Sequence, residues 1–167
     1  HRGVDPKGIL RALWAKFSKH DTQGASTITM QLARNIFLSA DQTAERKLKE
    51  TLLAIEIEKS FTKDEILEMY LNQIYLGSGA YGVQAASSLY FNKSCKDLSP
   101  AQSAVLAGLP QSPNEYSPLN HENKAKDRAK EVLGRMHAKE VGFLSDSQYA
   151  AALKELEAMK FYNKNRQ

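Results

Sequence analysis

Residues 24–50 gather polar and charged side chains of the types that bind phosphate and sugar groups. The set contains one hydroxyl, two amides, three cations and one carboxylate: Ser26, Gln31, Asn35, Arg34, Arg46, Lys49 and Glu50. Cations grouped around a single carboxylate are costly to hold against an apolar core. The segment therefore predicts a cleft for an anionic substrate.

Helical periodicity would place part of this set on one helix. From Arg46 onward, at about 100° per residue, one face carries Arg46, Lys49, Glu50, Leu53 and Ile57. A second face is apolar and carries Leu48, Leu52 and Ile55. A helix that is apolar on two sides is expected to be sandwiched inside the domain.

On the preceding helix, four polar side chains are expected to fall within one narrow arc of the helix surface: Thr27, Gln31, Arg34 and Asn35. A plainer interpretation of both helices stays open. Ser26 would then be only an N-cap, and Arg46 and Glu50 an ordinary i,i+4 surface pair of little energetic value.

Helix signals run along the whole chain, and no alternating stretch is long enough for a sheet. Three capping-box patterns each predict the start of a helix: Thr62 with Glu65, Ser99 with Gln102, and Ser145 with Gln148. Two final helices are expected over residues 123–140 and 145–160. The 167 residues suffice for one domain with a sizeable core, so the predicted class is all-α.

Four motifs in register resemble the glycosyltransferase domain of class A penicillin-binding proteins, the family that polymerises peptidoglycan from lipid II. Residues 1–5, H-R-G-V-D, resemble the end of its first motif, E-D-x-x-F-x-x-H-x-G. Residues 24–31, G-A-S-T-I-T-M-Q, are similar to the second motif, and residues 46–50, R-K-L-K-E, to the third. Residues 63–72, K-D-E-I-L-E-M-Y-L-N, resemble the fourth. The likeness then continues to Pro113 and covers nearly the whole chain.

The resemblance implies a particular architecture. The larger lobe would be lysozyme-like, and a smaller membrane-associated jaw lobe would occupy approximately residues 6–25. Residues 1–167 would form a single N-terminally truncated glycosyltransferase domain. In such proteins a transmembrane helix precedes this domain and a penicillin-binding transpeptidase domain follows it. The implied location is the outer face of the bacterial cytoplasmic membrane.

The implied chemistry is inverting glycosyl transfer, which joins lipid II into β-1,4-linked glycan strands and releases undecaprenyl diphosphate. The base of the family is a Glu of the first motif, which would lie upstream of His1. Arg46 and Lys49 would hold the diphosphate, with Glu50 as the catalytic carboxylate beside it. The remaining expected substrate ligands are Ser26, Gln31, Arg34 and Asn35. No cofactor is required, although Mg²⁺ or Mn²⁺ at the diphosphate fits, and moenomycin-type inhibitors are expected to bind.

The rest of the resemblance refines these expectations. Met30 stands where the second motif has Gln, and Gln42 stands where many members carry Arg. Arg34 replaces a more usual Lys, which keeps the charge but changes its geometry. The fourth motif is assigned no chemistry and is expected to serve packing.

An amphipathic helix is predicted to begin at Asp5 and Pro6. Its apolar stripe includes Leu13, Trp14 and Phe17 among cations, which fits both an ordinary packed helix and a helix at a membrane surface. The family's jaw dips into the bilayer, so the resemblance implies that these three residues contact the membrane.

Composition and charge restrict the possible partners less tightly than the motifs do. The net charge of +4 suits an anionic partner, whether nucleic acid, phospholipid or a phosphorylated substrate. The cations are spread over many helices without a nucleic-acid-binding motif, which argues against nucleic acid. The four His residues lack metal-ligand spacing, so no metal site is predicted. No apolar run approaches the length of about 18 residues that a membrane-spanning helix needs.

Two other functions fit parts of the same sequence. A lysozyme-like peptidoglycan hydrolase would need an acid for a sugar leaving group, but it has no need of Arg46 and Lys49 together. A non-catalytic lipid-diphosphate binding module would use the same basic cleft, and it fits a chain without the first-motif Glu.

Overall fold

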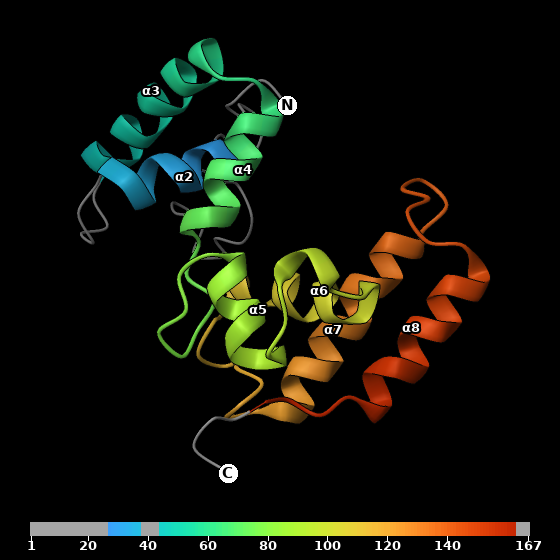
Figure 1. The fold of residues 1–167 in the computed structure, drawn as a ribbon. Coiled ribbons are helices and arrows are strands. Elements are labelled where there is room, and N and C mark those ends of the chain that lie inside the picture. Colours follow the sequence, from blue (N-terminus) through green and yellow to red (C-terminus); the bar gives the residue numbers. More distant parts are fainter. Residues whose placement is uncertain (1–26, 38–43, 163–167) are drawn as a thin grey trace, which may run out of the picture. The chain divides into compact units, whose positions relative to one another are not determined.

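The computed structural model describes residues 27–37 and 44–162. Within them the regular elements are helices (Figure 1). Two extended positions, Tyr75 and Tyr81, form an isolated antiparallel bridge. The all-α prediction is therefore confirmed. The jaw prediction for residues 6–25, including Leu13, Trp14 and Phe17, lies outside the described residues, as does Ser26.

The chain divides into two compact units, unit 1 (His1–Gln73) and unit 2 (Ile74–Gln167). The described part of unit 1 holds α2 (Ile28–Phe37), α3 (Ala44–Ser60) and α4 (Lys63–Gln73). Helix α2 packs against both α3 and α4 (Figure 1). The core that these helices share includes the buried side chains of Leu32, Ala33, Ile57 and Ile66.

Position 30 contributes to the packing of unit 1. The Met30 side chain is fully buried, so the thioether that replaces the family's Gln packs in the interior. At the start of α4, the Thr62 hydroxyl accepts from the Glu65 N–H at 3.3 Å, and the Thr62 N–H donates to Glu65 Oε2 at 2.7 Å. This reciprocal pair confirms the predicted capping box.

The prediction that α3 is sandwiched is wrong for the described residues. Leu48 is 61% exposed and Leu52 is 55% exposed, and Ile55 is also exposed. The cause is the number of neighbours: α3 packs mainly on α2, through the opposite face that carries Leu53 and Ile57. Periodicity identified two apolar faces, but only one of them meets another described helix.

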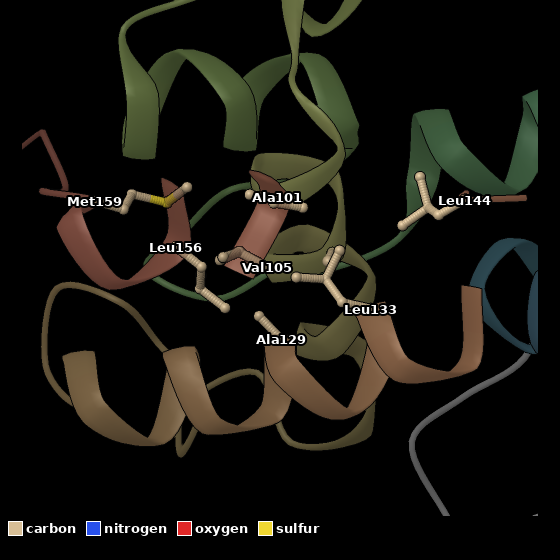
Figure 2. Packing of buried hydrophobic residues seen from close by; sticks show 9 residues of the cluster. Ala101, Val105, Ala129, Leu133, Leu144, Leu156 and Met159 are labelled. Carbon is tan, nitrogen blue, oxygen red and sulfur yellow. The ribbon is translucent and has the colours of Figure 1, made fainter. Parts of the chain in front are cut away.

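Unit 2 contains α5 (Val83–Phe91), η1 (Cys95–Asp97), α6 (Pro100–Gly108), η2 (Leu109–Gln111), α7 (Glu122–His137) and α8 (Asp146–Ala158). Helix α6 packs on α7 and α8, which also pack on each other. Figure 2 shows Ala101 and Val105 of α6 meeting Ala129 and Leu133 of α7 and Leu156 of α8 in one core. Small residues on α6 and α7 let the two backbones approach closely. A side chain at Gly108 would meet Arg128 Cγ at 2.8 Å.

Capping fixes where two helices of unit 2 begin. The Ser99 hydroxyl accepts from the Gln102 N–H at 3.1 Å, and Ser145 does the same for Gln148 at 3.3 Å. In both cases the Ser N–H in turn donates a hydrogen bond to the Gln side-chain oxygen. Both predicted capping boxes are confirmed, and with them the starts of α6 and α8.

A glycine-containing loop opens unit 2 and is held from two sides. Gly77 has a φ of +82°, and a Cβ there would lie 2.6 Å from the Pro113 carbonyl oxygen. The buried Tyr90 hydroxyl donates to the Leu76 carbonyl at 2.8 Å. The loop is therefore fixed against residues far along the chain.

No helix within the two described stretches is long and apolar enough to cross a bilayer.

Candidate functional site

The first turns of α3 bury a carboxylate between two cations. The Glu50 side chain is only 1% exposed. Its Oε1 lies 3.3 Å from Arg46 Nε, one turn earlier, and its Oε2 lies 2.7 Å from Lys47 Nζ. Spacings of four and three residues bring these side chains together on one side of the helix. An isolated buried carboxylate is unfavourable, and the two cations compensate that cost at Glu50.

One oxygen of this carboxylate can still accept a hydrogen bond. Glu50 Oε1 is buried and has the Arg46 contact, but it accepts no well-aligned hydrogen bond from the described residues. A buried acceptor without a donor costs about 1–3 kcal/mol. Such an atom is suited to a hydroxyl or other donor that a ligand would bring. Within residues 27–37 and 44–162, no cluster of three or more acidic, His or Cys side chains could hold a metal ion.

The second lysine of the motif is placed differently from the sequence interpretation. Lys49 is 57% exposed, and its Nζ pairs with Glu45 Oε1 at 2.7 Å. Lys47, which the sequence interpretation did not place beside Glu50, is the lysine that contacts it. The reason is geometric: neighbouring residues on a helix lie about 100° apart, so Lys49 cannot easily face the carboxylate beside it. The i,i+3 spacing of Lys47 and Glu50 was the signal available in the sequence.

Helix α2 brings two predicted ligands close to α4. The Tyr70 hydroxyl donates to Gln31 Oε1 at 3.2 Å. Burial raises the pKa of Tyr70, and this effect exceeds the opposing influence of the nearby Arg34 charge. Gln31 and Arg34 are each partly exposed, whereas Asn35 at the end of the same arc is exposed. Unit 1 therefore holds Gln31 and Arg34 beside one buried tyrosine.

A third contact joins all three described helices of unit 1. Thr29 on α2 donates to Glu58 Oε1 on α3 at 2.5 Å, and Lys63 at the start of α4 pairs with Glu58 Oε2. Thr29 is buried. Burial raises the pKa of Glu58, but the bonds from Lys63 and Thr29 outweigh it and hold the pKa below its usual range. Sequence reasoning did not anticipate this link, because its three residues come from separate helices.

Together these contacts define a helical unit with a buried, doubly paired carboxylate and further cations on the same helices, which is a suitable arrangement for an anionic ligand. Comparison with known proteins places this chain in a family: the family described as Transglycosylase matches residues 1–137. The chain belongs to this family.

Individual relatives agree with that assignment. Penicillin-binding protein 1A of Escherichia coli is 53% identical over 89% of this chain and 17% of its own length. Penicillin-binding protein 1A of Aquifex aeolicus is 48% identical over 98% of this chain and 22% of its own length. The crystal structure of penicillin-binding protein 1A from Haemophilus influenzae is 32% identical, with a TM-score of 0.54, over 81% of this chain and 17% of that chain. The chain thus spans about a fifth of the length of these curated relatives. This likeness agrees with the expected all-α, lysozyme-like class.

Proposed function

We propose that this chain is the peptidoglycan glycosyltransferase part of a longer class A penicillin-binding protein. The observation that carries the proposal is Glu50, buried between Arg46 and Lys47 on a helix whose sequence matches the family's third motif. Family membership and the names of the relatives support it. The parent protein would add a transpeptidase domain and work at the outer face of the bacterial cytoplasmic membrane.

The proposed reaction joins two lipid-linked sugars. The 4-hydroxyl of the acceptor N-acetylglucosamine attacks C1 of the donor N-acetylmuramic acid. As the new β-1,4 bond forms, the bond from C1 to the diphosphate oxygen breaks, and the configuration at C1 inverts. The hydroxyl proton passes to a base, which the family supplies from a Glu upstream of His1. The electron pair of the broken bond leaves with undecaprenyl diphosphate.

The described residues would serve the leaving-group side of this reaction. Arg46 and Lys47 supply positive charge where the diphosphate gains negative charge, which lowers the barrier most when the charges are already in place. Glu50 keeps both cations positioned, and its Oε1 has capacity to accept a hydroxyl of the donor sugar. Lys49 remains a proposed ligand only if it exchanges Glu45 for the diphosphate. A Mg²⁺ or Mn²⁺ ion at the diphosphate remains a prediction.

The test is polymerisation of lipid II in detergent, with this chain and with a version extended upstream through the first motif. Long glycan strands from the extended chain alone would support both the function and the location of the base. Absence of polymer from both chains, each of them folded, would refute glycosyl transfer and favour a lipid-diphosphate binding module. Soluble muropeptides released from purified sacculi would favour the hydrolase instead.

Three lysine variants of the extended chain sharpen the test. Lys47→Met removes the cation beside Glu50 and should lower turnover by about 100-fold. Lys49→Met should cost much less if Lys47 holds the diphosphate, and more if the sequence interpretation is right. Lys59→Met is the matched control, because Lys59 forms an exposed pair with Glu56 on the same helix. A loss of turnover that is equal in all three would show that only overall charge matters.

A further inference from the structure

Tyr70 lies in the fourth motif, to which the sequence assigned no chemistry, and it reaches a predicted substrate ligand. Its side chain is buried on α4, while its hydroxyl donates to the Gln31 side chain on α2 at 3.2 Å. Buried tyrosine hydroxyls usually need such a partner. The contact is therefore a defined link between a packing residue and a partly exposed polar residue.

The direction of this hydrogen bond determines what Gln31 can offer a ligand. A primary amide has an oxygen that accepts hydrogen bonds and an NH₂ group that donates two. With Oε1 bonded to Tyr70, the NH₂ group is the end left for a ligand. An anionic oxygen is attracted to the NH₂ group and repelled by a carbonyl oxygen. The reverse orientation of the amide would leave the buried Tyr70 proton without its acceptor.

Arg34 provides independent evidence that this place suits an anion. It follows Gln31 by three residues on α2, so both side chains lie on the same side of the helix. The Arg34 charge lowers the pKa of the Tyr70 hydroxyl, against the larger effect of burial. Because burial raises the pKa of Tyr70 above its usual value, the hydroxyl keeps its proton at neutral pH and remains a donor.

We propose that Tyr70 is a positioning residue that fixes the Gln31 amide with its NH₂ group toward a phosphate oxygen of the lipid-linked donor. This inference rests on the proposed function, since it assumes a diphosphate as the ligand. Tyr70 does not touch the substrate in this scheme. It acts through Gln31, and this distinguishes it from a residue that only packs in the core.

A double-mutant cycle on the full chain tests this distinction. The probe is farnesyl diphosphate, with farnesol as the uncharged control, and binding is measured by calorimetry. Tyr70→Phe keeps the ring and removes the hydroxyl, and it should weaken diphosphate binding about fivefold. Gln31→Ala should weaken it by at least as much. In the Gln31→Ala background, Tyr70→Phe should then have no further effect.

Two further measurements keep the test clear. Tyr75→Phe is the matched control, because its hydroxyl bonds to Asn114 in unit 2, and it should bind the probe as the original chain does. The side-chain NH₂ resonances of Gln31, followed by NMR, should shift on adding farnesyl diphosphate and shift less in Tyr70→Phe.

The outcomes separate this inference from the proposed function. Equal weakening by Tyr70→Phe with and without Gln31 would show a purely structural tyrosine and overturn the inference. Unchanged binding by a folded Tyr70→Phe chain would overturn it as well. If the original chain binds farnesyl diphosphate no better than farnesol, the proposed function fails and the inference fails with it.

Discussion

In unit 1 a carboxylate is buried between two cations, while large apolar side chains on α2, α3 and α4 are exposed. In the described part of unit 2 no charged residue is buried, and the exposed large apolar side chains lie in loops rather than on helices α5 to α8. Glu50 is buried, yet Leu48 and Leu52 on the same helix are more than half exposed. In unit 2, Leu133 and Leu156 are fully buried in a core shared by three helices.

The polar residues that are buried in the described part of unit 2 are neutral and have partners: Ser87, Gln102 and Ser117. Ser87 donates to the Lys93 carbonyl at 2.9 Å, and Gln102 completes the cap of α6. Neutral, satisfied groups are much less costly to bury than charges. The described helices of unit 2 are thus stabilised by packing and capping. In unit 1, α3 buries the charged Glu50 cluster with Arg46 and Lys47 and exposes Leu48 and Leu52. Under the proposed function, unit 1 would carry the ligand chemistry and unit 2 would serve mainly stability.

The largest expected effect separates activity from stability in unit 1. Glu50→Gln keeps the shape of the side chain but removes the negative charge between Arg46 and Lys47. Turnover of lipid II by the upstream-extended chain should fall about 1000-fold, or about 4 kcal/mol of transition-state stabilisation, because the cations lose the group that positions them. Circular dichroism should show a cooperatively folded chain. Near-normal turnover by that folded variant would refute the role of Glu50.

The next effect should appear in the stability of unit 2. Gly77→Ala places a methyl group 2.6 Å from the Pro113 carbonyl, at a backbone φ of +82°. The free energy of unfolding should fall by about 3 kcal/mol, measured by urea denaturation. Gly79 has a similar φ of +79° but open space around it, so Gly79→Ala should cost only about 1–2 kcal/mol. Equal costs at both positions would show that the contact with Pro113 is unimportant.

Local sequence rules anticipated much of both units, because they act over three or four residues. The capping pairs at Ser99 and Ser145 were predicted from spacing alone and are present in the structure. The pairing of Arg46 with Glu50 follows from the same rule. What could not be predicted is which helix packs on which face. Periodicity shows that Leu48 is on an apolar face, but it does not show whether another helix covers that face.

The same limit explains the side-chain contacts that sequence reasoning missed. Thr29 is bonded to Glu58, and Gln31 to Tyr70, across separations of 29 and 39 residues. Such pairs depend on the relative placement of helices, which a single sequence does not specify. Family resemblance supplied the candidate ligands on α2 and α3, but it did not supply the residues that hold them.

A smaller effect is expected at the link between Thr29 and Glu58. Thr29→Val removes the hydroxyl that donates to the carboxylate and should lower the free energy of unfolding by about 1–2 kcal/mol. Thr29→Ser keeps the hydroxyl and should recover most of that loss. If Val and Ser behave alike in urea denaturation, the hydroxyl is not what stabilises the link.

The pH dependence of this link has a defined sign. Burial opposes the charge of Glu58, but the bonds from Lys63 and Thr29 prevail and lower its pKa below the usual value. Because the folded pKa lies below the unfolded one, the contribution is complete above the unfolded pKa of about 4.3 and is lost as pH falls through the folded value. Thr29→Val should therefore make the free energy of unfolding less sensitive to acid in this range.

The smallest predicted effect tests the capping of unit 2. Ser145→Ala removes the hydroxyl that accepts from the Gln148 N–H at the start of α8, leaving an N–H of the first turn without its acceptor. The free energy of unfolding should fall by about 1 kcal/mol. Ser145→Asp can accept the same bond and places a negative charge at the helix N-terminus, so it should retain most of the stability. Diphosphate binding should be unchanged in both variants, because the charge cluster lies in unit 1. A loss of binding in Ser145→Ala without unfolding would contradict the division between a ligand-binding unit 1 and a stabilising unit 2.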